Sequence, residues 1–179
     1  MGSEVAYAVE RFRGDETRAT RPTERGRFEQ ILGRHHRRLR RVVAGVLGDP
    51  DRVDDVLQEA YLKAYRRLPK RFANEAHEAT WLYRVVYRCC LDELRRRSRE
   101  KESPSADVHV LAPRVDSAGR LDVERAFAAL KPADRAVLLL VDLAGLDYET
   151  AAEVLRVPRG TVASRLSTAR RRFRSVLDA

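Results

Sequence analysis

Apolar residues recur at helical spacing along most of this chain of 179 residues. They fall three or four positions apart over residues 22 to 48, and the same spacing returns over residues 49 to 68 and 79 to 99. Each segment therefore offers one apolar face, and we expect three helices that bundle around one core. No segment alternates apolar and polar residues over the length of a strand, so the pattern predicts an all-α fold.

The helical spacing is interrupted between residues 100 and 119, which hold two prolines and three serines. Such a composition is typical of a linker, and helical spacing resumes after it, over residues 121 to 130 and again from Pro132. The first residues of the chain are polar and aperiodic. We therefore expect a flexible tail (residues 1–22), a helical domain (23–99), a flexible linker (100–119) and a second small helical domain (120–179).

Residues 143 to 174 predict two helices joined by a tight turn. Tyr148, Ala151, Ala152 and Leu155 share one apolar face, and Pro158 suits the first turn of the next helix. The second helix carries hydroxyl and guanidinium groups on its polar face, which is what a DNA major groove accepts. A plain helical hairpin with a solvated basic face is the alternative. The candidate DNA-contacting residues are Arg159, Thr161, Ser164, Arg165, Thr168 and Arg171.

The net charge of +9 supports a polyanionic partner. No apolar run is long enough to span a bilayer, and the N-terminus lacks the apolar core of a signal peptide, so we expect a cytoplasmic protein without membrane insertion. Cys89 and Cys90 are adjacent, and neighbours on a helix point apart, so we expect a buried, inert pair and no disulfide. The four histidines have no metal-ligand spacing, and we expect neither a metal nor a cofactor.

An acidic and amide stripe occupies the second predicted helix. Asp55, Gln58, Glu59 and Leu62 lie at i, i+3, i+4 and i+7, and Asp54 lies beside them. In a basic protein, such a stripe indicates a docking surface for a basic protein partner. A solvated helix start is the structural alternative, and a hydrolytic carboxylate pair is disfavoured because no nucleophile, metal ligand or phosphate-binding loop accompanies it. The candidate docking residues are Asp54, Asp55, Leu57, Gln58, Glu59 and Leu62.

Aromatic residues are interleaved with arginines between residues 71 and 97. Rings among arginines suit unpaired bases, which stack on the rings while the guanidinium groups hold phosphates. Helical spacing gives Trp81 a place in the core, whereas Tyr83, Asn74 and the arginines are expected to be freer. The candidate residues for unpaired DNA are Arg71, Phe72, Asn74, Trp81, Tyr83, Arg84, Arg88, Arg95 and Arg96.

In this order, these features resemble the bacterial sigma-70 family, specifically its extracytoplasmic-function (ECF) group, which keeps only regions two and four. The resemblance covers about residues 27 to 177. Residues 54 to 65 look like the region 2.2 motif, which implies that Asp55, Gln58 and Glu59 contact the β′ clamp helices of core RNA polymerase.

Two further segments carry the resemblance. Residues 72 to 96 are similar to regions 2.3 and 2.4, which melt promoter DNA and recognise the minus-ten element. Residues 130 to 138 and 160 to 166 look like region four, which recognises the minus-thirty-five element and meets the polymerase β flap. Glu78 and Arg88 depart from the family pattern, where an aromatic residue and an asparagine are frequent, and Ala163 replaces a usual cation.

The resemblance implies a transcription initiation factor, not an enzyme, that binds core RNA polymerase and promoter DNA and is controlled by an anti-sigma factor. Two other classes stay open at this point. A stand-alone helix-turn-helix regulator would act as a dimer on duplex DNA without polymerase. An adaptor that works by protein contact alone is disfavoured by the arginine-rich last helix.

Overall fold

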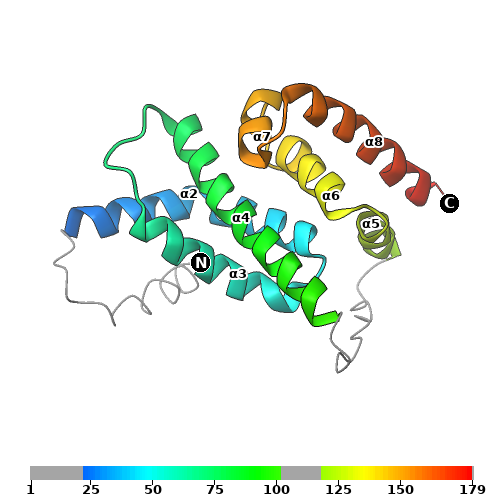
Figure 1. Cartoon of the computed structure of the whole chain (residues 1–179), viewed down its shortest axis with the longest axis horizontal. Helices are drawn as coiled ribbons and strands as arrows, with labels where there is room; N and C mark the ends of the chain where they lie inside the picture. The colour runs from blue at the N-terminus through cyan, green and yellow to red at the C-terminus, as the bar shows by residue number, and fades with distance from the viewer. Residues whose placement is uncertain (1–21, 102–117, 179) are drawn as a thin grey trace.

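The computed structural model describes residues 22–101 and 118–178, and within these ranges the chain is helical without a strand (Figure 1). The described residues confirm the predicted all-α fold of two helical domains, whereas the predicted tail and most of the linker lie outside them. The first unit holds α2 (Pro22–Leu47), the short η2 (Pro50–Arg52), α3 (Val53–Arg66) and α4 (Glu75–Lys101). The second unit holds α5 (Ala118–Ala128), α6 (Pro132–Leu138), η3 (Leu139–Leu143), α7 (Tyr148–Leu155) and α8 (Arg159–Leu177).

Side-chain and backbone caps set the ends of the helices in the first unit. Gly48 follows the end of α2 with a φ of 65°, a conformation that glycine adopts without strain. Asp49 then accepts a hydrogen bond from the backbone N–H of Asp51 and starts η2. The helix α4 begins at Glu75, before the predicted start near residue 79, because Asn74 Oδ1 accepts the backbone N–H of His77 at 2.9 Å.

The second unit contains a helix-turn-helix, as predicted, with one unexpected element before it. The single predicted helix after Pro132 ends in the π-helical turn η3, where the N–H of Ala144 donates to the carbonyl of Leu139 at 2.9 Å. Between α7 and α8 the chain turns at Arg156, which has a left-handed φ of 56°. Pro158 precedes α8 as its N-cap, one residue before the predicted position in the first turn.

The N-cap of α7 makes a pH-dependent contribution to stability. Asp147 Oδ1 accepts the backbone N–H of Thr150 at 2.7 Å, and this bond holds the pKa of Asp147 below its ordinary value of 3.8. Because the pKa is lower in the folded than in the unfolded chain, the stabilisation is complete above pH 3.8 and is lost as the pH falls through the folded value.

We therefore expect Asp147→Ala to lower the free energy of unfolding by about 1 kcal/mol at neutral pH. The difference from the wild type should close well below pH 3.8, whereas Asp147→Ser, which keeps a capping oxygen, should stay near the wild type. Urea unfolding followed by circular dichroism at both pH values measures this. An equal loss at both pH values would assign the effect to packing instead of the cap.

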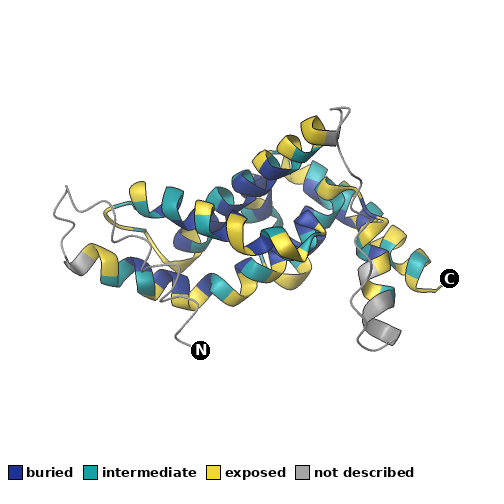
Figure 2. Ribbon diagram, turned by 90° about the horizontal axis from the view of Figure 1, so that it is seen from below, coloured by how far each residue is buried: buried dark blue, intermediate teal, exposed yellow. Residues whose placement is uncertain are grey.

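The two units pack against each other and share one contiguous apolar core (Figure 2). The helix α7 lies on α4, and α6 and η3 lie on α2. A side chain at Gly45 of α2 would place its Cβ 2.5 Å from Leu139 Cδ1, so this glycine allows the close approach of the second unit. The sequence pattern predicted the two units but not this contact.

The adjacent cysteines lie inside the first unit, as predicted. Cys89 and Cys90 are free thiols with 1% and 0% of their surface exposed. Burial raises the pKa of Cys89 to about 11 and that of Cys90 to about 12, so the thiols are protonated and unreactive near neutral pH. Among the described residues, no helix is long and apolar enough to cross a membrane, and no group of side chains has a metal-binding arrangement.

Candidate nucleic-acid and docking interfaces

The acidic stripe lies on the exposed face of α3. The side chains of Asp54 and Glu59 are 63% and 55% exposed, and Asp55 is also exposed. Asp54 forms an ion pair with Arg40, and Glu59 accepts from Lys63 at 2.7 Å. Within the described part of the chain, Asp55 has no ion pair, so its charge is available to a partner.

The other predicted docking residues differ in how far they reach the surface. Gln58 and Leu62 are half-buried beside the acids. Leu57 is only 2% exposed and belongs to the core, so the structure corrects its assignment to the surface. It holds α3 in place beneath the acidic stripe, which the remaining five residues form.

A buried carboxylate connects α4 to the turn before α3. Glu93 accepts from Arg96 at 2.6 Å and from Arg97 at 2.9 Å, and Arg97 also pairs with Asp49 at 3.0 Å. Burial alone would raise the pKa of Glu93, but the hydrogen bonds from Arg97 and Arg96 overcome it and hold the pKa below its ordinary value. This network fixes the direction of Arg96, one of the predicted DNA contacts.

An open hollow of about 500 Å³ lies between α2 and the start of α4. Its rim carries three of the predicted DNA residues, Arg71, Phe72 and Asn74. The Phe72 ring packs on Trp81 with centroids 5.3 Å apart, and both rings are half-buried, so Trp81 is partly in the core as predicted and supports the Phe72 ring from behind.

The same hollow is also lined by residues that are not among the predicted DNA contacts: Arg27, Arg34, Lys70, Glu75 and Glu78. Arg34 donates to both carboxylate oxygens of Glu78, at 2.7 and 2.9 Å, and His35 Nε2 lies 3.2 Å from Glu78 Oε1. Arg34 and Glu78 are 44 positions apart, so no local pattern could pair them. The run of arginine and histidine residues over positions 34 to 41 is the sequence signal for a basic rim here.

The structure contradicts the prediction that Tyr83 is freer. Tyr83 is 3% exposed, and Tyr87, one turn further along α4, is 8% exposed. Burial is the main cause that raises the pKa of both hydroxyls, and Arg165 of α8 opposes it at Tyr87. Arg38 of α2 acts on the Tyr83 hydroxyl, so Tyr83 faces the core of the first unit, whereas Tyr87, beside Arg165, lies at the contact with the second unit.

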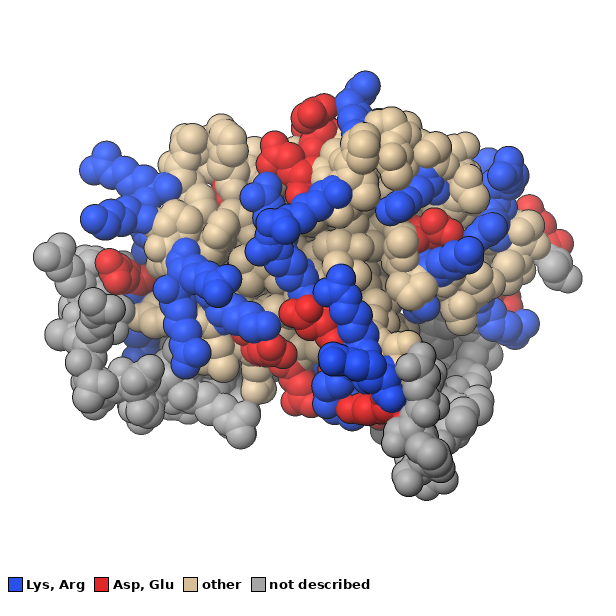
Figure 3. All heavy atoms as spheres, viewed as in Figure 1, with Lys and Arg blue, Asp and Glu red and all other residues tan. Residues whose placement is uncertain are grey.

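The predicted arginines of α4 form a basic ridge on the surface. Arg95 is exposed and Arg88 is half-buried, whereas Arg84 is engaged with Glu153 of α7 at 2.9 Å. Figure 3 shows lysine and arginine side chains along the ridge that α4 forms in Figure 1, with acidic side chains among them. A ridge of this kind follows a phosphate backbone without selecting a base sequence.

The predicted residues of α8 lie on its exposed side and on one flank. Arg159, Ser164 and Arg171 are exposed, and the three others, Thr161, Arg165 and Thr168, are half-buried. The buried face of the helix consists of Val162, Leu166 and Ala169.

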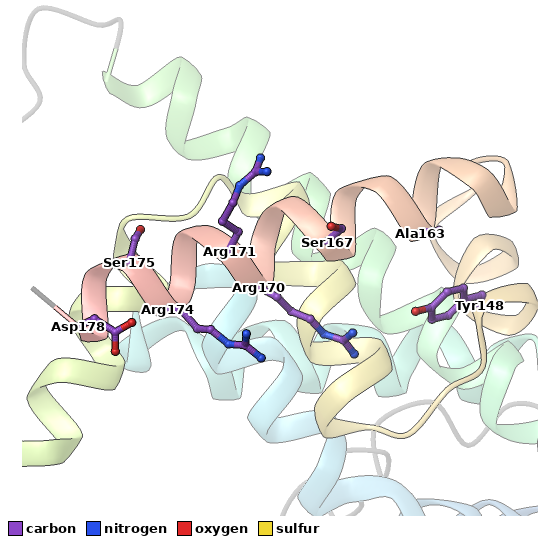
Figure 4. Close-up of a pocket in the computed structure, with 8 residues that line it drawn as sticks. All are labelled: Tyr148, Ala163, Ser167, Arg170, Arg171, Arg174, Ser175 and Asp178. Carbon is purple, nitrogen blue, oxygen red and sulfur yellow. The ribbon is translucent and has the colours of Figure 1, made fainter.

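The opposite flank of α8 borders a second hollow of about 540 Å³ (Figure 4). Arg170 and Arg174 extend toward the side of Tyr148, whereas Arg171 points away from it. Arg170 donates to Asp142 at 2.5 and 3.0 Å, and Arg172 donates to Asp134 at 3.4 Å, so both charges are partly neutralised. Among the described residues, Arg171 and Arg174 form no ion pair and are the outward cations of this half of the helix.

Family models match both units of the chain. Sigma-70 region 2 matches residues 31–100, and sigma-70 region 4 matches residues 120–173. Among curated relatives, ECF RNA polymerase sigma factor SigM of Mycobacterium tuberculosis is 36% identical over 157 residues, which are 86% of this chain and 79% of SigM. The ECF RNA polymerase sigma-E factor of Escherichia coli K12 is 31% identical over 161 residues, 80% of this chain and 82% of that protein.

Solved structures agree on the fold. The sigma factor RpoE of Bartonella quintana, in complex with the anti-sigma factor NepR, has a TM-score of 0.71 at 24% identity and covers 85% of this chain and 97% of its own. CnrH, in complex with the cytosolic domain of CnrY, has a TM-score of 0.62 at 22% identity and covers 98% and 95%.

The acidic stripe on α3, the aromatic and arginine-rich α4 and the helix-turn-helix are the features expected of a two-unit, helical DNA-binding protein of transcription. The matches to both regions and the identity to curated relatives then fix its family. The chain belongs to the sigma-70 family, as a member of the ECF group.

Proposed function

We propose that this chain is a transcription initiation factor that binds core RNA polymerase and directs it to promoters. The observation that carries the proposal is the combination of two surfaces on the first unit. An exposed acidic face lies on α3, and a hollow lined by Phe72 and by four basic side chains lies where α4 begins. A docking face and a site for unpaired bases on the same unit are what a factor needs if it is to melt DNA only when polymerase is present.

We assign a separate task to each surface. Asp55 and Glu59 meet basic groups on the polymerase β′ clamp helices. Phe72, backed by Trp81, stacks an unpaired base of the minus-ten element, and the arginines around it and along α4 hold the phosphates. Ser164 and Arg171 of α8 approach the major groove at the minus-thirty-five element, and the second unit meets the β flap.

A regulatory protein partner is part of the proposal. The structures of RpoE and CnrH are complexes with NepR, an anti-sigma factor, and with the cytosolic domain of CnrY. By this likeness, we propose that a protein of the anti-sigma class binds this chain in the bacterial cytoplasm.

A helix-turn-helix regulator that acts alone as a dimer would explain α7 and α8 but neither the acidic stripe on α3 nor the Phe72 hollow. Run-off transcription with purified core RNA polymerase and a promoter library distinguishes an initiation factor from a stand-alone regulator. We expect the wild-type chain to support initiation from a subset of templates, and core polymerase without it to support none of them. A chain that binds duplex DNA as a dimer but gives no transcripts with core polymerase would favour the stand-alone regulator.

A further inference from the structure

The loop that joins α3 to α4 carries three of the residues predicted to contact DNA, Arg71, Phe72 and Asn74 (Figure 1). We call this segment, residues 67–74, the Phe72 loop. Among the described residues, its backbone groups hydrogen-bond with other backbone groups only at its two ends, in the turn after α3 and at Asn74. The middle of the loop is therefore not held by regular secondary structure.

A side chain of α2 holds the middle of the Phe72 loop. Arg27 donates from Nη1 to the backbone carbonyl of Lys70 and from Nη2 to the backbone carbonyl of Pro69. The two carbonyls follow each other in the chain, so the planar fork of one guanidinium engages both of them. Arg27 and Phe72 also line the same hollow, so the contact lies beside the site proposed for unpaired bases.

Packing fixes the position of Arg27 on α2. The next residue, Phe28, is 2% exposed, and its ring packs on Tyr65 of α3 with centroids 5.3 Å apart. Seven positions after Arg27, Arg34 pairs with Glu78 of α4 at 2.7 Å. Residues seven positions apart lie on one face of a helix, so the same face of α2 holds both the Phe72 loop and the first turns of α4.

These contacts determine where the Phe72 ring lies. Phe72 follows Lys70 by two residues, and its ring packs on Trp81 with centroids 5.3 Å apart. Arg27 restrains the backbone just before the ring, and Trp81 supports the ring itself. A loop released from Arg27 samples more backbone conformations, and only a fraction of them keep the ring where a base can stack on it.

We infer that Arg27 is a positioning residue for promoter melting, which acts on DNA through the Phe72 loop that it holds and not by a contact of its own. This inference rests on the proposed function, in which Phe72 stacks an unpaired base. By fixing the loop in advance, Arg27 reduces the ordering that is needed when the base binds. The competing explanation is that Arg27, as a cation at the hollow, binds a DNA phosphate directly.

The fluorescence of Trp81, the only tryptophan of the chain, reports the loop without DNA or polymerase. We expect Arg27→Ala to raise the acrylamide quenching constant of Trp81 about two-fold, because the Phe72 ring no longer stays packed on it. Arg25→Ala is the matched control. It removes one positive charge from the same helix, where Arg25 is 46% exposed and pairs with Glu29 at 3.1 Å, and it should quench like the wild type. Equal quenching of Arg27→Ala and the wild type overturns the inference.

A double-mutant cycle separates positioning from a direct DNA contact. We expect Arg27→Ala to lower open-complex formation about five-fold in the otherwise wild-type chain but less than about two-fold in the Phe72→Ala chain, with core polymerase binding unchanged in both. This non-additivity is expected if Arg27 acts through the Phe72 ring. Equal losses in the two backgrounds assign Arg27 a contact with DNA of its own and overturn the positioning role.

Arg27→Lys tests the fork itself. Lysine keeps the positive charge but presents a compact ammonium, which fits two neighbouring carbonyls less well than a guanidinium does. We expect its open-complex formation and its Trp81 quenching to lie between those of the wild type and Arg27→Ala. A lysine variant that opens promoters like the wild type while its loop is as mobile as in Arg27→Ala contradicts the positioning role. If the wild-type chain opens no promoter, the proposed function fails. This failure is distinguishable, because the positioning role alone fails only when the wild type opens promoters and Arg27→Ala opens them equally well.

Discussion

Asp55→Arg is expected to weaken binding of the chain to core RNA polymerase by roughly 30-fold, which corresponds to about 2 kcal/mol. Asp55 is exposed on α3, and no ion pair engages it among the described residues, so the substitution places a cation against a basic partner surface without breaking an internal contact. The measurement is a titration of fluorescently labelled chain with core polymerase at low salt. The loss should shrink as salt is added, because exposed charges are screened.

Two further variants separate docking from folding at this position. Asp55 lies in the first turn of α3, where an acid also favours the helix dipole, so Asp55→Asn should lose less affinity than Asp55→Arg. Asp122→Arg makes the same charge change on α5, where the side chain is 48% exposed, and should bind polymerase like the wild type. If Asp55→Arg also binds like the wild type, the acidic stripe is a solvated helix start and not a docking surface.

Much of the fold was predictable because it follows from local rules. The spacing of apolar residues located the helices, and capping residues such as Asp49 and Asp147 set where some of them begin. The π turn at Leu139–Leu143 does not follow from the pattern, because the buried leucines that lead into it, Leu138 to Leu140, fit an α-helix equally well. The early start of α4 does not follow from apolar spacing, because it depends on the cap that the Asn74 side chain provides.

The candidate sites were predictable only where all of their residues lie on one helix. The acidic stripe lies within a single helix, so its spacing placed it correctly, apart from Leu57. The pairing of Arg34 with Glu78 and the burial of Tyr83 depend on packing between distant segments, which no periodicity in one helix specifies. A tyrosine between arginines looks the same in sequence whether a base or another helix covers it.

The Phe72 ring is expected to be the most sensitive position for promoter melting. Phe72→Ala should lower open-complex formation by roughly 10-fold or more, because the stacking of one base on an aromatic ring contributes about 1–3 kcal/mol. The ring is half-buried at the rim of the hollow and packs on Trp81 with centroids 5.3 Å apart. Fluorescence of 2-aminopurine placed in the minus-ten element reports the melted strand directly.

Three controls separate stacking from stability and from docking. Phe72→Tyr keeps an aromatic face and should stay within about three-fold of the wild type, whereas Phe72→Leu keeps the apolar volume and should behave like the alanine variant. Core polymerase binding should be unchanged in all three variants, because Phe72 lies at the hollow between α2 and the start of α4 and packs on Trp81, whereas the stripe occupies the exposed face of α3. On a template with a premelted minus-ten region, the alanine variant should recover only part of its activity, since the base still has no ring to stack on. Full recovery there would mean that Phe72 helps to separate the strands without holding the unpaired base.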